Sequence, residues 1–320
     1  MFNRLQHGPN KYKRIMFTFA RFQLNIYLYN MKLLIYAIFS VFLLPTITVA
    51  QVNDYTNRKI IKYLYTDNQY LSKKAEVKKK FAHVSPGHWG EFVKGVDQDI
   101  VTREKIIALT FDACGGSRKG NGYDSLLIKY LRKDSIPATL FVTGLWIDAN
   151  YKTFLNLSKD SLFEIENHGL NHRPCSVNGE SEFGIQGTKS ITDAFDEIEA
   201  NAEKIELITG RRPLFFRSAT AFTDEACAKM ATMLGITFVS FDVLSGDAIP
   251  KTPKTTIVSN VLEHVRPGAL VIMHFNHPEN KTYEALQVLI PKLKAEGYKF
   301  VKLQGYPLKR KSLNRKICPN

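Results

Sequence analysis

Polar residues capable of chemistry stand at the ends of five short apolar segments of this chain. The segments are I-I-A-L-T-F, L-F-E-I-E-N, L-F-F, I-T-F-V-S-F and A-L-V-I-M. The polar residues at, or within one position of, their carboxyl ends are Asp112, His168, Arg217, Asp242 and His274. Each segment is typical of a buried strand, and stretches of helical periodicity separate them. Because all carboxyl ends open onto one face in a barrel of parallel strands, the sequence predicts that these five side chains converge.

The alternation of apolar and helical stretches predicts an α/β fold, a distorted (β/α) barrel with about seven parallel strands. Seven strands are predicted, at 106–111, 138–143, 162–166, 214–216, 236–241, 269–273 and 299–303. Helices are predicted at 123–133, 151–158, 190–208, 224–234, 256–264 and 282–296. The barrel forms one catalytic domain over residues 99–305, between a polar, lysine-rich surface extension at 51–98 and a basic tail at 306–320.

Residues 1–50 have the pattern of a targeting segment. Leu33 to Ala50 is an uncharged, mostly apolar run, and Lys32 precedes it together with a second possible initiator, Met31. Small residues before position 51 suit signal peptidase, so we expect a cleaved signal peptide and a secreted or periplasmic protein. The alternative is an uncleaved membrane anchor that holds the same domain outside the cytoplasm. In either case contact with a membrane is expected only through this segment.

The positive charge of the chain does not by itself indicate a nucleic-acid partner. The net charge is +14, but residues 1–50 hold six Lys or Arg residues and no acidic residue, so the remainder carries +8 (14 less 6). An excess of this size fits anionic partners in general, including cell-wall polymers. The sequence has no zinc-finger spacing, P-loop or aromatic RNA-binding motif, and we therefore expect no nucleic-acid partner.

His168 and His172 are spaced four apart in N-H-G-L-N-H-R-P. Two imidazoles at this spacing can face the same side of one backbone turn and bind a divalent metal ion. The alternative is a pair of surface histidines in a turn made by the neighbouring Asn167 and Gly169. The position of the pair after a predicted strand, level with the other polar strand ends, favours the metal site.

The motifs in this order resemble those of the polysaccharide deacetylases, the NodB homology domain of carbohydrate esterase family 4. The resemblance covers about 105–303, through I-A-L-T-F-D, I-E-N-H-G-L-N-H-R-P, L-F-F-R, S-F-D-V-L-S-G-D and P-G-A-L-V-I-M-H. It implies a NodB-like barrel with a divalent metal, Zn²⁺ by preference, held by His168 and His172. It also implies that Asp112 is the general base, that Arg217 orients it, that Asp242 belongs to the charge network, and that His274 is the general acid.

The first motif departs from the family pattern. It reads T-F-D-A-C-G-G, so that Ala113 stands where the family usually has a second aspartate, a metal ligand. Three outcomes are open. Asp112 itself joins the histidines as a ligand, another group such as Asp124 or the Cys114 thiolate completes the site, or metal binding is lost. Of these, we favour a metal site with altered ligands.

The chain has four cysteines, at 114, 175, 227 and 318, which allow three complete pairings. Cys114 and Cys175 each follow a motif, so we expect both at the catalytic face, where a bridge would join two loops. Cys227 lies in a helical stretch and is expected to be a free thiol.

The resemblance implies an exported, metal-dependent hydrolase that removes N-acetyl groups from an amino-sugar polymer such as peptidoglycan, a chitin-like chain or an exopolysaccharide. One alternative is a carbohydrate-binding barrel without activity, because its ligand set is incomplete. Another is an O-acetyl esterase or amidohydrolase that uses the same face.

Overall fold

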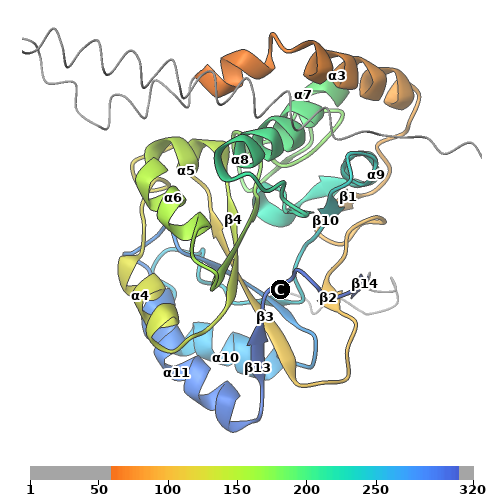
Figure 1. Ribbon diagram of the computed structural model, residues 1–320. Helices are drawn as coiled ribbons and strands as arrows, with labels where there is room; N and C mark the ends of the chain where they lie inside the picture. The colour runs from red at the N-terminus through yellow and green to blue at the C-terminus, as the bar shows by residue number, and fades with distance from the viewer. Residues whose placement is uncertain (1–58, 310–320) are drawn as a thin grey trace, which may run out of the picture. The chain divides into compact units, whose positions relative to one another are not determined.

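The computed structural model describes residues 59–309, and its centre is a curled, eight-stranded sheet in which every strand pairing is parallel (Figure 1). Seven strands follow the order β10-β8-β5-β4-β3-β12-β11, and β13 pairs with β3. The strands are β3 (Ile106–Ala113), β4 (Ala138–Val142), β5 (Phe163–Asn167), β8 (Phe215–Phe216), β10 (Thr237–Phe238), β11 (Val243–Leu244), β12 (Leu270–His274) and β13 (Lys299–Val301). All seven predicted strands are present, and the distorted barrel is confirmed. The two-residue strand β11 was not predicted, because so short a segment has no period of its own.

Strand β3 has neighbours along both of its edges. Its residues 108–112 pair with β12 on one edge, while 106–108 pair with β13 and 110–113 with β4. All eight of its residues are buried, which explains the nearly continuous apolar run in the sequence. β3 is therefore the most constrained strand of the sheet.

The two faces of β3 belong to different layers. Ile107 and Leu109 lie in the apolar cluster that also contains the buried faces of the helices, whereas Ile106 and Ala108 lie in a second cluster on the concave side. Because side chains alternate between the faces of a strand, Asp112 shares the second face. The strand thus directs Asp112 into the barrel.

Helices surround the sheet at the predicted places. They are α4 (Ser125–Lys133), α5 (Gly144–Ala149), α6 (Tyr151–Ser158), α7 (Ile191–Phe195), α8 (Asn201–Thr209), α9 (Glu225–Met233), α10 (Lys254–His264) and α11 (Thr282–Ala295). The helix predicted at 190–208 is in fact α7 and α8 joined by a π-helical segment, η1 (Asp196–Ala200). The short helix α5 was not predicted, since six residues give too little pattern.

The segment predicted as a surface extension contains a further helix, α3 (Asn68–Phe81), which the prediction missed. Asp67 caps the first turn of α3. The helix buries only Tyr70, Val77 and Phe81, so its apolar pattern is weak. Ion pairs add to these contacts, because Lys73 and Lys74 of α3 pair with Glu199 and Asp196 of η1. Charge complementarity rather than apolar periodicity thus contributes much of the docking of α3.

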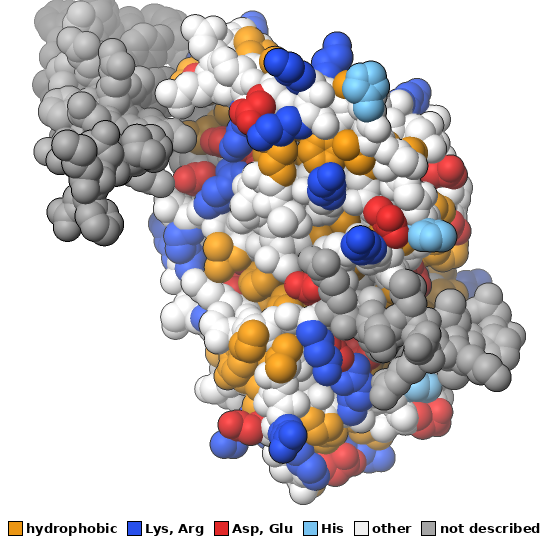
Figure 2. Space-filling model, turned by 90° about the vertical axis from the view of Figure 1, so that its right-hand side faces the viewer, with side chains coloured by type: hydrophobic (Ala, Val, Ile, Leu, Met, Phe, Trp, Pro, Cys, Tyr) orange, Lys and Arg blue, Asp and Glu red, His pale blue; other side chains and the backbone are white. Residues whose placement is uncertain are grey.

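Three small antiparallel pairs lie outside the main sheet: β1 (Trp89–Gly90) with β9 (Thr223–Asp224), β2 (Asp99–Ile100) with β14 (Leu308–Lys309), and β6 (Ser181–Glu182) with β7 (Ile185–Gln186). The predicted targeting segment and the end of the basic tail lie outside the described residues. Within 59–309, no helix is long and apolar enough to cross a membrane. Figure 2 shows one face on which basic side chains are interspersed with acidic and apolar ones instead of forming a single field.

Candidate active site and metal centre

Four of the five predicted polar residues meet at the carboxyl end of the sheet. Asp112 and His274 lie opposite each other in the pairing of β3 with β12. His168 follows β5 directly, and its Nε2 lies 3.8 Å from Oδ2 of Asp112. Arg217 follows β8 and contacts Asp112 as well. The convergence predicted from the strand ends is therefore present for these four residues.

Arg217 connects the carboxylate with the first histidine. Its fully buried guanidinium donates from Nη1 to Oδ1 of Asp112 at 2.8 Å and from Nη2 to the carbonyl oxygen of Ser240 at 2.8 Å. The guanidinium also lies 4.3 Å from the ring centroid of Phe141. A buried, directed cation of this kind fixes Asp112 and leaves its Oδ2 toward the histidines.

His168, His172 and Cys114 form a cluster with metal-ligating geometry. One ligand atom from each lies within 4.8 Å of the other two. Nδ1 of His168 lies 2.8 Å from the carbonyl oxygen of Arg217, so this nitrogen carries the proton. The lone pair of Nε2 is then available to bind a metal ion. His172 has a positive φ of 54°, which turns its ring to 5.1 Å from that of His168 between centroids. The second of the three open outcomes, completion by Cys114, agrees with this arrangement.

The electrostatics of the cluster favour a thiolate. Burial alone would raise the pKa of Cys114, but the charge of His172 and hydrogen bonds with His168, His172 and His274 hold it well below its usual value. Burial likewise opposes protonation of His168, yet Asp112 and Cys114 raise the pKa of that imidazole. A thiolate beside two imidazoles, as Cys114 lies beside His168 and His172, favours the binding of a divalent cation.

The loop after β3 brings the Cys114 thiol to the histidines. Gly115 and Gly116 both have positive φ, at 77° and 78°. A Cβ on Gly115 would lie 2.5 Å from the backbone nitrogen of Trp146 in α5, so only glycine fits there. Thr143 donates its hydroxyl to the carbonyl oxygen of Cys114 at 2.6 Å. The C-G-G sequence is thus a tight turn against α5.

The other candidates for a third ligand are placed differently. The side chain of Asp124 caps α4, where it accepts the backbone N–H groups of Leu126 and Leu127. Ala113 is fully buried in the apolar cluster beneath the helices. Asp112 is held through Oδ1 by Arg217. Cys114 therefore fits the missing position better than any of them.

His274 is held by Asp247, a residue that the motif reading did not single out. Oδ2 of Asp247 accepts the backbone N–H of His274 at 2.7 Å, and Oδ1 lies 3.0 Å from its Nδ1. Thr282 donates its hydroxyl to the same carboxylate at 2.9 Å. Burial lowers the pKa of His274, but Asp247 outweighs this effect and raises it well above the usual value. S-G-D, at the end of the fourth motif, is the signal that could have indicated Asp247.

Asp242 does not reach the site, contrary to the prediction. Its backbone N–H donates to the carbonyl oxygen of Leu270, the first residue of β12, whereas His274 is the last. Its side chain accepts from Arg266 at 2.7 Å, and Arg266 also binds Asp99. Because β10 ends at Phe238 and the chain then continues into β11, Asp242 lies below the catalytic edge. Its role is in an ion pair at the other end of β12.

Glu197 positions the second histidine and was also not predicted. It belongs to η1, is buried, and accepts the backbone N–H groups of Asn171 and Arg173, the neighbours of His172, each at 3.0 Å. A Cβ on Gly169 would lie 2.3 Å from Oε1 of Glu197, which explains the glycine between the two histidines. Burial raises the pKa of Glu197 to about 7. The π-helical segment thus carries the carboxylate that holds the backbone on either side of His172.

The described cysteines are free thiols, so of the open alternatives no bridge joins Cys114 to Cys175. Cys175 is fully buried and hydrogen-bonds with Cys227, and burial raises the pKa of both thiols. Cys114 contacts the histidines instead. Cys318 lies outside the described residues.

Comparison with known proteins agrees with this arrangement. A family profile for polysaccharide deacetylase matches residues 99–239. The "Uncharacterized protein YlxY" of Bacillus subtilis (strain 168) is 27% identical over 181 residues, which are 56% of this chain and 51% of YlxY. The "Peptidoglycan-N-acetylmuramic acid deacetylase PdaA" of the same organism is 27% identical over 202 residues, 62% of this chain and 70% of PdaA.

A similar solved structure is that of BA3943 from Bacillus anthracis, described as a CE4 family pseudoenzyme. It has a TM-score of 0.53 and 26% identity, covering 62% of this chain and 64% of BA3943. A mutant of BA3943 is described as having restored enzymatic activity. The chain thus spans about half of YlxY and somewhat less than two thirds of BA3943. Residues 99–239 thus form a polysaccharide deacetylase domain, and the chain is similar in sequence and fold to proteins described as peptidoglycan deacetylases and as members of family CE4.

Proposed function

We propose that this protein is an exported hydrolase that uses a divalent metal ion to remove N-acetyl groups from peptidoglycan. One observation carries the proposal: a cluster of two imidazoles and a thiol lies beside a buried carboxylate–arginine pair and a carboxylate-held histidine. Hydrolysis of an acetamide needs a base, an acid for the poor amine leaving group, and stabilisation of the carbonyl oxygen. The arrangement offers a group for each requirement.

The metal would be held by Cys114, His168 and His172. Two neutral imidazoles and a thiolate are a donor set that suits zinc, and three protein ligands leave a coordination position open for catalysis. The Arg217 carbonyl fixes the tautomer of His168, as outer-shell partners of zinc ligands commonly do. When bound, the ion supplies Lewis acidity toward water and toward the acetyl carbonyl.

The protein's own residues handle the protons. Asp112 is the general base that takes a proton from the attacking water, and Arg217 keeps it correctly oriented. His274 is the general acid that gives a proton to the amine nitrogen as the C–N bond breaks, while Asp247 holds its ring. The products are acetate and a free amino sugar, and water supplies the added atoms.

The substrate assignment rests on the relatives and on the predicted targeting segment. PdaA is named as a deacetylase of the N-acetylmuramic acid of peptidoglycan. The segment at 33–50 would carry the catalytic domain across the membrane, where this polymer is found. Chitin-like chains and exopolysaccharides present the same acetamide and belong in the test.

A second candidate function is glycan binding without catalysis. Two observations favour it: BA3943 is described as a pseudoenzyme, and Ala113 replaces the usual second carboxylate of the family. Against it stands the Cys114 thiol, which lies within ligand distance of both histidines. The two candidates differ in whether the protein binds metal and releases acetate.

Acetate release decides between them. The protein is incubated with acetylated peptidoglycan, chitin oligomers and an acetylated exopolysaccharide, before and after chelation and again after zinc is restored. We expect release from peptidoglycan that is lost with chelator and regained with zinc. Absence of release from every polymer by the zinc-loaded protein would contradict catalysis, and binding of the same polymers would then support the second candidate.

A further inference from the structure

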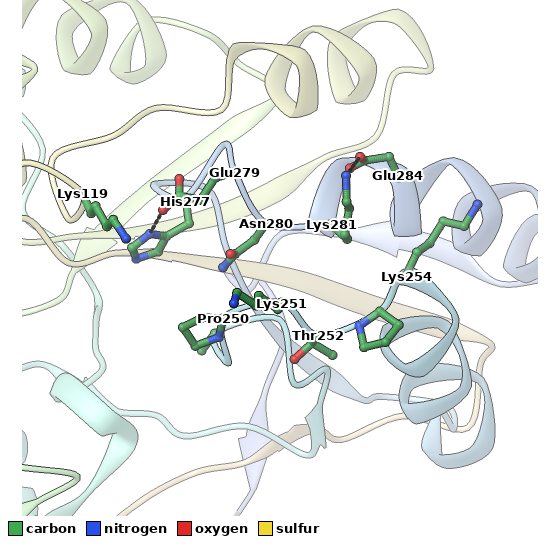
Figure 3. Close-up of a pocket in the computed structure, with 12 residues that line it drawn as sticks. Lys119, Pro250, Lys251, Thr252, Lys254, His277, Glu279, Asn280, Lys281 and Glu284 are labelled. Atoms are coloured by element: carbon green, nitrogen blue, oxygen red, sulfur yellow. Dashed lines mark hydrogen bonds and ion pairs between the residues drawn. The ribbon is translucent and has the colours of Figure 1, made fainter.

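A hollow of about 750 Å³ opens beside the catalytic loops. Its walls come from the loop after β3, the loop between β11 and α10, and the loop that joins β12 to α11 (Figure 3). Figure 3 shows Lys119 and His277 at one end, Lys254 and Lys281 at the other, and Lys251 between them. The space is large enough to hold a substituent of a sugar unit.

Positive charge predominates in the lining of this hollow. Its charged side chains are four lysines against two glutamates, an excess of two positive charges: Lys119, Lys251, Lys254 and Lys281 against Glu279 and Glu284. Within residues 59–309, the first three lysines form no ion pair within 4.0 Å, whereas Lys281 pairs with Glu284 at 2.7 Å. Lysines that line one hollow repel one another, and a bound anion relieves that repulsion.

The two glutamates respond to this field. Burial opposes ionisation of both. The pKa of Glu279 is nevertheless lowered by a backbone hydrogen bond, by His277 and, less, by Lys119, and that of Glu284 by Lys281, by a backbone hydrogen bond and by Lys254. The lysines of the hollow therefore contribute to stabilising negative charge on two carboxylates of its wall.

One wall residue of the hollow contacts Asp247, the residue that holds the proposed general acid. Asn280 donates its side-chain N–H to the carbonyl oxygen of Asp247 at 2.8 Å, and the carboxylate of Asp247 holds His274. Asn276 donates to the carbonyl oxygen of Gly120, next to Lys119, and this bond joins the loop after β12 to the loop after β3. His277 lies in the wall of the hollow and follows His274, the last residue of β12, by three residues, so the hollow lies on loops that adjoin the proposed catalytic residues.

We propose that this lysine hollow binds a carboxylate of the glycan substrate, namely the lactyl carboxylate of N-acetylmuramic acid. The inference rests on the proposed function and narrows it. Muramic acid differs from glucosamine in carrying a lactyl ether with a carboxylate, whereas chitin-like chains have no charge at that position. Lysine ammonium groups on flexible stems suit a single carboxylate that approaches on a mobile chain. The hollow would then select acidic over neutral acetylated sugars.

The test uses a matched pair of ligands. One is a tetrasaccharide of alternating N-acetylglucosamine and N-acetylmuramic acid, and the other is the same compound with its lactyl carboxyls converted to methylamides. We expect the wild type to prefer the acid about three- to tenfold in kcat/KM, since two partly exposed charge contacts contribute modestly. In K119Q/K251Q the preference should fall toward unity, and K119R/K251R should retain it. The control K78Q/K79Q removes equal charge from α3 and should leave the preference unchanged.

Binding of the two compounds, measured by calorimetry with the same variants, separates this inference from the proposed function. If acetate release is absent but the lysine variants lose preference for the acid in binding, the hollow is confirmed and the catalytic proposal fails. If the wild type deacetylates both compounds equally well, catalysis stands and the hollow is refuted. If K119Q/K251Q bound the acid and the methylamide more weakly by the same factor, that result would likewise refute carboxylate recognition.

Discussion

Asp247 holds His274 at two points, through the backbone N–H at 2.7 Å and through the ring nitrogen Nδ1 at 3.0 Å. One carboxylate therefore fixes both the position of the strand end and the rotation of the imidazole. The ring also interacts with Cys114. This geometry is expected of a general acid whose partner keeps it protonated.

Replacement of His274 should separate proton transfer from metal binding. We expect His274→Ala to lower kcat by roughly two to four powers of ten, the usual contribution of general acid–base catalysis, with zinc content unchanged. Asp247→Asn should cause a smaller loss, because the ring keeps its place but loses its charged partner. Turnover and metal analysis on the same samples measure both quantities. Loss of zinc from His274→Ala would identify this residue as a ligand instead.

Cys114 should be visible spectroscopically as a ligand. Cobalt-loaded wild-type protein is expected to show a sulfur-to-cobalt charge-transfer band in the near ultraviolet, and Cys114→Ser should lack it. The same substitution should weaken zinc binding about tenfold or more, which corresponds to ~1.4 kcal/mol. Cys227→Ala provides the matched control, because its thiol is buried away from the cluster of ligand atoms and its loss should leave the band intact. A band that persists in Cys114→Ser would rule out the thiolate.

Arg217 should not be replaceable by lysine. The guanidinium bonds Asp112 and the Ser240 carbonyl at once and stacks on Phe141, whereas an ammonium group cannot reproduce this planar arrangement. We expect Arg217→Lys to lower kcat about a hundredfold with little change in KM, since the substrate does not touch this buried group. Arg217→Ala should in addition cost about 3–5 kcal/mol in the free energy of unfolding, because Asp112 is left buried without its partner. Steady-state kinetics and urea unfolding measure the two effects, and wild-type kcat in Arg217→Lys would contradict the role.

Glu197 should make stability depend on pH. Its pKa is about 7 in the folded protein, raised by burial from 4.5, with the charges of Arg173 and Asp193 facing it. Between these pH values the folded state binds more protons than the unfolded state, so the free energy of unfolding should fall as pH rises from 4.5 to 7. The contribution is on the order of 3 kcal/mol, and Glu197→Gln should remove it. Urea unfolding of metal-free protein at pH 5 and pH 8 measures this, and an unchanged difference in the variant would contradict it.

The strands and four of the five site residues were predictable because their signals are local. A buried strand reads as an apolar run, and a polar residue at its end stands out, as with Asp112 and His168. Asp242 misled because it follows an equally apolar run, I-T-F-V-S-F, of which only Thr237 and Phe238 pair as a strand. The pairing register sets how far along the barrel axis a residue lies, and the sequence of one segment alone does not determine that register.

The residues that were missed act through contacts distant in sequence. Glu197 lies 26 positions from Asn171, and its direction depends on a π-helical turn within a helix of ordinary pattern. Asp247 reaches His274 across 27 positions. The sequence could name Cys114 only as one possible third ligand. It shows the chemistry of the thiol, but not the turn at Gly115 that directs the thiol toward His168 and His172.

The position of Asp112 on β3, with Cys114 directly after the end of that strand, has an evolutionary consequence. β3 is paired along both edges, so the proposed base and the start of the turn that carries the proposed thiol ligand share one rigid support. A substitution in the turn beyond the strand can exchange a hard oxygen ligand for a soft sulfur one without displacing the base. Lineages of this fold could therefore change the metal they prefer by drift in one short turn, while selection on the hydrolytic step continues to hold the rest of the sheet constant.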